Sequence, residues 1–328
     1  MIENNTISII IPVYNPTSYL VILCRSISEI LITMNMAHEI ILIDDSDDVA
    51  AWKIVREITD VLPKTSACRL SRNVGQHAAL IAGVRQATGD VLITIDDDGQ
   101  HSPNEIPILL EALKDDVDVV YGFPSRGVHG GLRGIAALSS KLLLAAVTGV
   151  PEMRHMSAFR AFRSEVIRST ADACGDDLNI DVLLSWSTRR FRAIESRHQV
   201  RKSGRSGYNA RRLFRHLLNL YIGYTIWPLR IASVTGLCAS FLGLTVLCYV
   251  VVVYMLNPAP VPGFAFIAST VAFFAGAQLL ALGIIGEYLA RIHVRSMGRP
   301  TYVVREVVGA RGEASGLDHG EALGGADR

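Results

Sequence analysis

Two long uncharged runs in the last third of the chain constrain its architecture most. No charged residue occurs from 231 to 256 or from 264 to 285, and a proline-rich stretch, 257–263, separates the runs. A helix needs about 20 apolar residues to cross the hydrocarbon of a bilayer. The sequence therefore predicts two transmembrane helices, and a buried helical hairpin in a soluble protein is the alternative.

Basic residues flank these runs at their outer ends. Arg230 precedes the first run, Arg291, Arg295 and Arg299 follow the second, and the connecting stretch has no Lys or Arg. By the positive-inside rule, both outer ends and the front of the chain face the cytoplasm. Just before the first run, leucines recur at helical spacing along one side of an expected helix, and arginines lie off that side. This pattern predicts an amphipathic helix on an anionic bilayer surface. We therefore expect a front domain (1–205), an interfacial helix (206–229), two transmembrane helices (230–290), a post-membrane arm (291–308) and a disordered tail (309–328).

The front part has the size of one α/β domain. Short, mostly apolar stretches at 7–13, 39–43 and 91–95 have the pattern of buried strands, and stretches of helical periodicity lie between them. Strands that alternate with helices predict a mainly parallel sheet with right-handed crossovers. In such a sheet, ligands bind at the carboxyl ends of the strands.

Three consecutive aspartates follow the expected strand 91–95. Alternate residues of a strand point to opposite faces, so Asp96 and Asp98 can converge on one point while the aspartate between them points away. Two carboxylates suit Mg²⁺ or Mn²⁺, which take further ligands from substrate phosphates, and Gln100 extends the same side. An acidic surface turn is the alternative. Against it, Ser102–Glu105 has the pattern of a capping box, which predicts that a helix starts at once.

A second acidic cluster, 44–48, follows the expected strand 39–43. A carboxylate can accept two hydrogen bonds from the ribose hydroxyls or the base of a nucleotide. The chain has neither the glycine-rich dinucleotide fingerprint nor a P-loop, so a metal ion and arginine would hold the phosphates. The net charge is only +1, and we expect no nucleic acid among the partners.

Four short motifs occur in an order that resembles one known family. They are Ile11-Pro-Val-Tyr-Asn15, Ile43-Asp-Asp-Ser-Asp-Asp48, Ser71-Arg-Asn-Val-Gly75 and Asp96-Asp-Asp-Gly-Gln-His101. Together they resemble the family 2 inverting glycosyltransferases of GT-A fold. Within that family the chain is most similar to the polyisoprenyl-phosphate glycosyltransferases, the group of dolichol-phosphate mannose synthase and its bacterial undecaprenyl-phosphate counterparts. The resemblance implies a Rossmann-like, mainly parallel α/β catalytic domain, followed by the interfacial helix and the two transmembrane helices.

The resemblance also implies an activity and a set of site residues. The expected enzyme moves one sugar from a nucleotide-diphosphate sugar of UDP or GDP type to a polyisoprenyl phosphate, with Mg²⁺ or Mn²⁺. It would be a homo-oligomer in the bacterial inner membrane, with its catalytic domain in the cytoplasm. The matching positions are Asp96, Asp98 and Arg126 for catalysis; Pro12, Tyr14, Asp44, Asp45, Arg72, Asp96 and Asp97 for the nucleotide; Asp96, Asp98 and Gln100 for the metal; and Arg133, Ser139, Ser140, Lys141, Arg201 and Arg205 for the acceptor phosphate.

Three other functions fit parts of the pattern. A processive polysaccharide synthase shares the front motifs, but it usually carries a Gln-x-x-Arg-Trp motif, which this sequence does not contain. A non-catalytic membrane scaffold could keep a degenerate transferase domain, although the aspartate motif here is intact. A tethered transferase with a soluble acceptor would not need two spans and a basic surface helix. A lipid acceptor explains these features together.

Overall fold

The computed structural model describes residues 5–124, 132–173, 179–196, 227–256, 263–297 and 300–309. The chain forms two compact units. One contains residues 1–208 together with 300–328, and the other contains residues 209–299.

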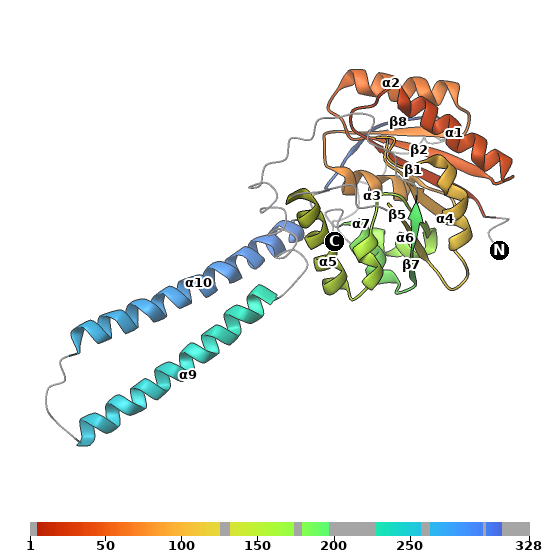
Figure 1. The fold of residues 1–328 in the computed structure, drawn as a ribbon. Coiled ribbons are helices and arrows are strands. Elements are labelled where there is room, and N and C mark those ends of the chain that lie inside the picture. The colour runs from red at the N-terminus through yellow and green to blue at the C-terminus, as the bar shows by residue number, and fades with distance from the viewer. Residues whose placement is uncertain are drawn as a thin grey trace, which may run out of the picture. The chain divides into compact units, whose positions relative to one another are not determined.

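An eight-stranded sheet forms the centre of the first unit. Its strands are β1 (Ile7–Val13), β2 (His38–Asp44), β3 (Thr65–Leu70), β4 (Val91–Thr94), β5 (Val119–Pro124), β6 (Arg160–Arg163), β7 (Phe191–Ser196) and β8 (Val304–Gly309). Their order in the sheet is β7-β5-β6-β4-β1-β2-β3-β8 (Figure 1). Strands β1 to β4 pair in parallel and so do β5 and β7, whereas β6 and β8 pair antiparallel with their neighbours. The predicted mainly parallel α/β sheet is confirmed.

Helices cover both faces of this sheet. The elements are α1 (Tyr19–Thr33), α2 (Val49–Val61), α3 (Gln76–Gln86), a 3₁₀ turn η1 (Pro103–Glu105), α4 (Ile106–Ala112), α5 (Leu132–Thr148), a 3₁₀ turn η2 (Pro151–His155), α6 (Ser164–Ala173) and α7 (Ile180–Ser187). Buried side chains of α1, α2 and α4 share one core with Ile9 and Ile11 of β1. Ile10 points to the other face and packs on α3 at Gly83, where an added Cβ would lie 2.4 Å from its Cγ2. Because β1 is buried on both faces, Ser8 is the one polar residue in its sequence.

The helix after the three aspartates begins differently from the sequence expectation. It starts with the 3₁₀ turn η1, and Ser102 makes no side-chain capping bond there, so the predicted capping box is wrong. Pro103 stands at the first position of the turn, where a missing N–H costs nothing. Eight residues (95–102) separate β4 from this turn, and the α-helix itself begins at Ile106.

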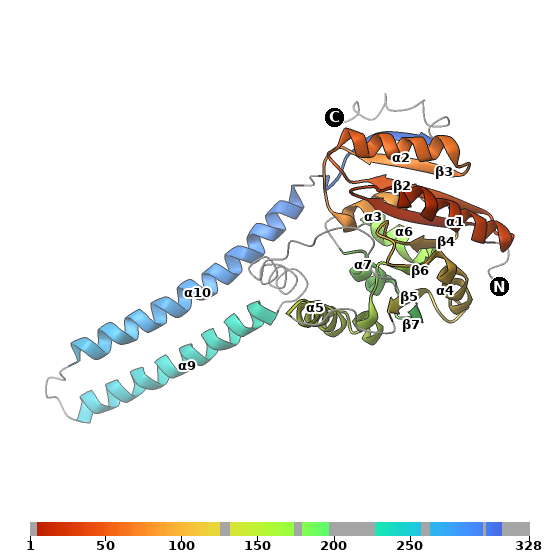
Figure 2. The same cartoon turned by 45° about the horizontal axis from the view of Figure 1, so that its top comes forward.

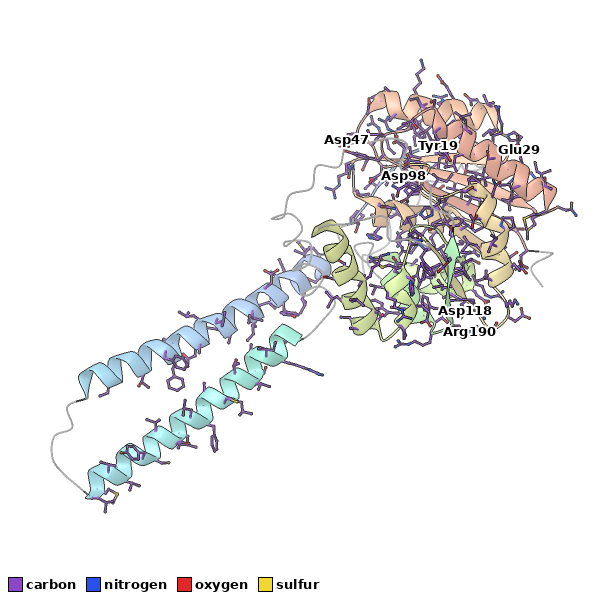
Figure 3. The ribbon with its side chains drawn as sticks, in the orientation of Figure 1. Tyr19, Glu29, Asp47, Asp98, Asp118 and Arg190 are labelled. Atoms are coloured by element: carbon purple, nitrogen blue, oxygen red, sulfur yellow. The ribbon has the colours of Figure 1, made fainter. Side chains whose placement is uncertain are left out.

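One edge of the sheet is held by a buried carboxylate. Asp118, just before β5, accepts hydrogen bonds of 2.9 and 2.8 Å from the guanidinium of Arg190, just before β7 (Figure 3). Thr188 donates to the same carboxylate at 2.5 Å. These bonds fix the start of β7 beside β5.

The second unit contains two long helices, α9 (Trp227–Leu256) and α10 (Phe264–Ser296), which lie side by side (Figures 1 and 2). Each has a stretch long and apolar enough to cross a membrane, Leu229–Val246 and Phe273–Val294. Gly243 lets the helices approach closely, since a Cβ there would lie 3.3 Å from the ring of Phe274. Large apolar side chains point outward from both helices, as in Leu237, which is 72% exposed.

Candidate functional site

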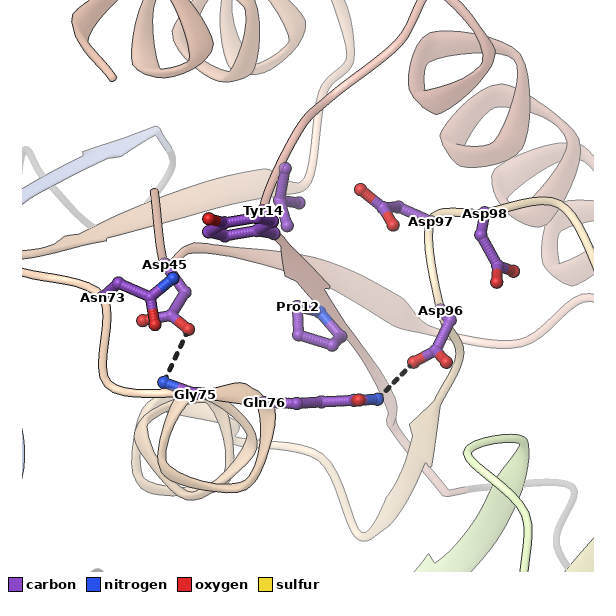
Figure 4. Close-up of a pocket in the computed structure, with 10 residues that line it drawn as sticks. Pro12, Tyr14, Asp45, Asn73, Gly75, Gln76, Asp96, Asp97 and Asp98 are labelled. Atoms are coloured by element: carbon purple, nitrogen blue, oxygen red, sulfur yellow. Dashed lines mark hydrogen bonds between the residues drawn. The ribbon is translucent and has the colours of Figure 1, made fainter. Parts of the chain in front are cut away.

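A cavity of about 310 Å³ opens at the carboxyl ends of β1, β2 and β4, the edge that the sequence predicted (Figure 4). The turns after these strands are held to β1 by backbone bonds. Asp45 N donates to Val13 O at 2.8 Å, and Ile95 N donates to Ile10 O at 3.2 Å. The lining residues are Pro12, Val13, Tyr14, Asp45, Asn73, Gly75, Gln76, Asp96, Asp97 and Asp98.

Asp45 is buried, and its carboxylate holds the segment 71–75 in place. Its two oxygens accept hydrogen bonds from Val74 N at 2.7 Å and Gly75 N at 2.9 Å. Burial raises the pKa of this carboxyl, and the two backbone bonds oppose the rise because they favour the charged form. Gly75 has a φ of 93°, which a residue with a side chain rarely adopts, and it starts α3. Asp45 therefore positions the wall of the cavity that leads into α3.

Asp44, one residue earlier, is not among the described residues that line the cavity. Its side chain is completely buried and accepts hydrogen bonds from Ser46 N at 3.1 Å and Ser46 Oγ at 2.5 Å. The guanidinium of Arg69 lies 3.8 Å from its second oxygen. Burial raises the pKa of Asp44 above its ordinary value. Asp44 thus stabilises the turn after β2 from a buried position outside the cavity lining.

The three aspartates of the 96–98 turn all line the cavity. Asp96 accepts a hydrogen bond of 2.7 Å from the side-chain amide of Gln76 (Figure 4). Asp97 also points into the cavity, contrary to the alternation expected from the sequence, because β4 ends at Thr94 and the aspartates follow it in a turn. Strand alternation therefore does not extend to them.

Asp98 is held by the backbone and the side chain of Gln100. The Gln100 N–H donates to Oδ1 at 3.0 Å, and its amide nitrogen donates to Oδ2 at 2.6 Å. Between them, Gly99 has a φ of 73°, and a Cβ there would lie 2.9 Å from the ring of Tyr19. Burial, and then the charge of Asp98, raise the pKa of Tyr19. The charge of Asp98 therefore acts on the Tyr19 hydroxyl.

The donor chemistry of the turn fits a hard divalent cation. Within the described ranges, no group of three or more His, Cys, Asp or Glu side chains is arranged to hold a metal ion. Mg²⁺ in nucleotide sites needs only one or two carboxylates and takes its other ligands from phosphates and water. Asp96 and Asp98 offer two such carboxylates at the rim of a cavity. These residues therefore fit a metal that binds together with a phosphorylated ligand.

Four of the residues expected near an acceptor phosphate lie on α5. Ser139 is exposed, and Ser140 and Lys141 are half-buried. Burial lowers the pKa of the Lys141 ammonium group, while the charge of Asp181 opposes that shift. Arg133 is in the first turn of the same helix, and its side chain lies outside the described part.

Other predicted site residues cannot be placed in the cavity. Arg126, Arg201 and Arg205 lie outside the described residues, as does most of the expected interfacial helix. Arg72 is exposed on the segment 71–75 and is not among the described lining residues.

A buried polar cluster lies beside the end of β4. Arg160 pairs with the carboxylate of Asp181, and its Nε donates to Thr94 Oγ1 at 3.1 Å. Tyr121 donates to the same carboxylate at 2.8 Å. The sequence patterns gave no indication of this cluster, because its members come from separate elements of the chain. Asn73 and Gln76 were likewise missed as lining residues, since their contacts form only between elements distant in the chain.

Comparison with known proteins agrees with this arrangement. The model of the family "Glycosyl transferase family 2" matches residues 8–169. Undecaprenyl-phosphate 4-deoxy-4-formamido-L-arabinose transferases of Yersinia pestis (strain Pestoides F) and Yersinia enterocolitica are each 32% identical to this chain over 307 residues, which covers 93% of this chain and 94% of theirs.

Two synthases are among the solved structures that align with this chain. Glucosyl-3-phosphoglycerate synthase from Mycobacterium tuberculosis aligns with a TM-score of 0.49 and 20% identity, over 68% of this chain and 80% of its own. Mannosyl-3-phosphoglycerate synthase from Rubrobacter xylanophilus aligns with a TM-score of 0.46 and 15% identity, over 66% and 72% of the two chains. The family match and the nearly full-length relatives establish that this chain is a glycosyltransferase and belongs to glycosyl transferase family 2.

Proposed function

We propose that the enzyme transfers one sugar, with inversion, from a nucleotide-diphosphate sugar to a polyisoprenyl phosphate, namely undecaprenyl phosphate. One combination of features carries the proposal: a carboxylate-rimmed cavity in a family 2 transferase unit and two long apolar helices in the same chain. The similar Yersinia enzymes are named for an undecaprenyl-phosphate acceptor, and the similarity covers both units. A soluble acceptor would give the apolar helices no role in the reaction.

The donor nucleotide would bind along Pro12, Tyr14 and Asp45. Tyr14 is 55% exposed at the cavity and offers a ring for a base to stack on. Asp45 uses its carboxylate to hold the segment 71–75, and each of its oxygens keeps a lone pair for a ribose hydroxyl. Asp44 and Arg72 are not among the described residues that line the cavity. Asp44 would support the nucleotide site by stabilising the turn after β2, and Arg72 would do so from the segment 71–75. Asp97 would stand beside the nucleotide.

Asp96 and Asp98 would hold Mg²⁺ or Mn²⁺ together with the donor diphosphate. When bound, the cation neutralises the charge that develops on the departing diphosphate. Gln76 and Gln100 orient the two carboxylates through the hydrogen bonds to Asp96 and Asp98. The direct metal contact expected of Gln100 remains a prediction.

The reaction needs no proton transfer to start. A phosphate monoester has a second pKa near 6, so its oxygen is largely ionised at neutral pH. That oxygen attacks the anomeric carbon as the bond from this carbon to the diphosphate oxygen breaks, and the electron pair leaves with the nucleoside diphosphate. Catalysis would therefore depend on alignment and on stabilisation of charge.

The acceptor phosphate would bind at Lys141, Ser139 and Ser140 of α5. Burial lowers the pKa of Lys141, and an anion beside the ammonium group would offset this effect. The arginines predicted from the sequence would complete the phosphate site and contact the sugar diphosphate: Arg126, Arg133, Arg201 and Arg205.

We further propose that the enzyme resides in the bacterial inner membrane with its catalytic unit in the cytoplasm. The basic residues outside the two apolar helices, and the lack of any in the stretch 257–263, support this orientation. Homo-oligomerisation, which the family resemblance implies, remains a prediction.

Radiolabelled nucleotide sugars, tested one by one on membranes that contain the enzyme and added undecaprenyl phosphate, would test the proposal. We expect one donor to label a lipid that extracts into organic solvent and carries a single sugar. A ladder of longer products would instead indicate a processive synthase. Failure to transfer or hydrolyse any donor would favour a membrane scaffold.

A further inference from the structure

We propose that β8, the strand that follows the second apolar helix in the chain, forms part of the donor site. It would do so by fixing the segment 71–76, which makes one wall of the cavity through Asn73, Gly75 and Gln76. The role as donor site rests on the proposed function. The structural role of β8 in fixing this segment is independent of the proposed function.

Strand β8 pairs antiparallel with β3, and the pairing extends to the first residue of the cavity wall. Ser66 lies opposite Gly309, and Leu70 lies opposite Val304. Beyond the end of β3, Ser71 N donates to Val303 O at 2.8 Å. The backbone of the segment 71–76 is therefore anchored at its start by the chain that leads into β8.

The rest of the segment is anchored by carboxylates of the turn after β2. Asn73 N donates to Asp47 at 3.1 Å, and Asp45 holds the next two amides. Gln76 then reaches Asp96. A continuous set of hydrogen bonds thus runs from β8 to the first carboxylate proposed to hold the metal. Loss of the β8 anchor would free only one end of the wall.

Two side chains secure β8 and the residues just before it against α2 and α3. Tyr302 accepts a hydrogen bond of 2.9 Å from Arg85 of α3, whose guanidinium lies 5.6 Å from the centre of the tyrosine ring. Glu306 accepts a hydrogen bond of 3.0 Å from the indole N–H of Trp52 on α2. These contacts join β8 to the helices on both faces of the sheet.

The far end of β8 has its own constraint. Gly309 has a φ of 96°, and an added Cβ would lie 2.4 Å from the carbonyl oxygen of Thr65. A side chain there would push the strand from β3 without changing Tyr302 or Glu306. Gly309→Ala therefore provides an independent way to loosen the same pairing.

Hydrogen exchange on the full-length protein in detergent, without ligand, tests the structural role of β8. The double variant Tyr302→Ala/Glu306→Ala and the variant Gly309→Ala should each speed amide exchange in 71–76 by at least about fivefold, since local opening exposes these amides. Arg305→Ala is the matched control, because Arg305 is exposed on the same strand. The thermal unfolding midpoint reports whether the remainder of the unit stays folded.

Binding of UDP and of GDP with Mn²⁺, measured by calorimetry, tests the donor role. Both loosened variants should bind the preferred nucleotide several-fold more weakly than wild type and Arg305→Ala, since a mobile wall must be ordered on binding. Unchanged exchange in 71–76, in variants that still fold, would overturn the inference whatever the nucleotide result. Faster exchange with unchanged nucleotide affinity would also overturn it. Faster exchange in a protein whose wild type binds neither nucleotide would instead refute the proposed donor site.

Discussion

The side-chain amide of Gln76 donates a hydrogen bond of 2.7 Å to Oδ1 of Asp96. The two residues come from different elements, the first turn of α3 and the turn after β4. A carboxylate that binds a metal must present its lone pairs in one direction, and residues hydrogen-bonded to metal ligands set that direction. Gln76 thus links the cavity wall 71–76 to one of the two carboxylates proposed to hold the metal.

Replacement of Gln76 should impair the metal-dependent step. Gln76→Ala removes the hydrogen bond and should lower transfer about 10-fold to 100-fold, as loss of a residue behind a metal ligand commonly does. Gln76→Glu should be worse, since it places a second negative charge beside Asp96. Titration of Mn²⁺ in the presence of UDP measures the effect directly. Equal metal affinity in wild type and both variants would contradict a positioning role.

Asp98→Asn should abolish transfer and leave the fold intact. The amide has only one oxygen and no charge, so it is a poor ligand for a hard cation. Initial rates on undecaprenyl phosphate measure the loss, and the thermal unfolding midpoint checks the fold. Asp60→Asn is the control, because Asp60 is exposed on α2 and distant in the chain from the cavity residues. Near-normal, metal-independent turnover in Asp98→Asn would overturn the assignment.

Asp45→Ala should weaken both nucleotide binding and stability. It leaves the N–H groups of Val74 and Gly75 without their present partner, and each unsatisfied group costs about 1–3 kcal/mol when buried. These groups are only partly buried, so we expect a cost nearer the lower figure. Chemical denaturation and UDP calorimetry measure the two effects. A loss of affinity with unchanged exchange in 71–76 would mean that Asp45 acts on the nucleotide alone.

The sequence predicted the sheet and the edge at which the cavity lies, because both follow from local patterns. The apolar run of β1 and the acidic residues after β2 and β4 are visible without any tertiary contact. The pairing of Gln76 with Asp96 is different, since it depends on how α3 packs against β1 and β2. The hydrophobic periodicity of a sequence does not predict a hydrogen bond between side chains of two separate elements.

Errors in the sequence reading also have local causes. Asp97 was expected to point away because the strand was extended to Ile95, whereas β4 ends at Thr94. Residues beyond the end of a strand no longer alternate between its two faces, so a strand end that is wrong by one residue can reverse the expected direction of a side chain. The Arg160–Asp181 pair was missed for another reason. The sequence does not reveal that both charged side chains are buried, and only their burial requires them to pair.

That buried pair yields a stability prediction. Asp181→Ala should destabilise the first unit by about 3–5 kcal/mol, because the Arg160 guanidinium stays buried without its counter-charge. Arg160→Met/Asp181→Leu removes both charges and should cost less than the single change. Unfolding in denaturant compares the variants. A single variant as stable as wild type would contradict the importance of the pair.

The stability of the first unit should fall as the pH drops below about 6.5, the ordinary pKa of histidine, and His38 contributes to this fall. Burial, and further the charge of Lys64, lower the pKa of His38, which lies 3.0 Å from Ser28 Oγ and 3.1 Å from Met36 O. The unfolded chain therefore binds a proton between the two pKa values when the folded chain does not, so stability rises with pH in that window. His38→Gln cannot titrate, and its unfolding midpoint should depend less on pH between 7 and 5. Parallel pH curves for wild type and His38→Gln would show that His38 takes no part in the acid sensitivity.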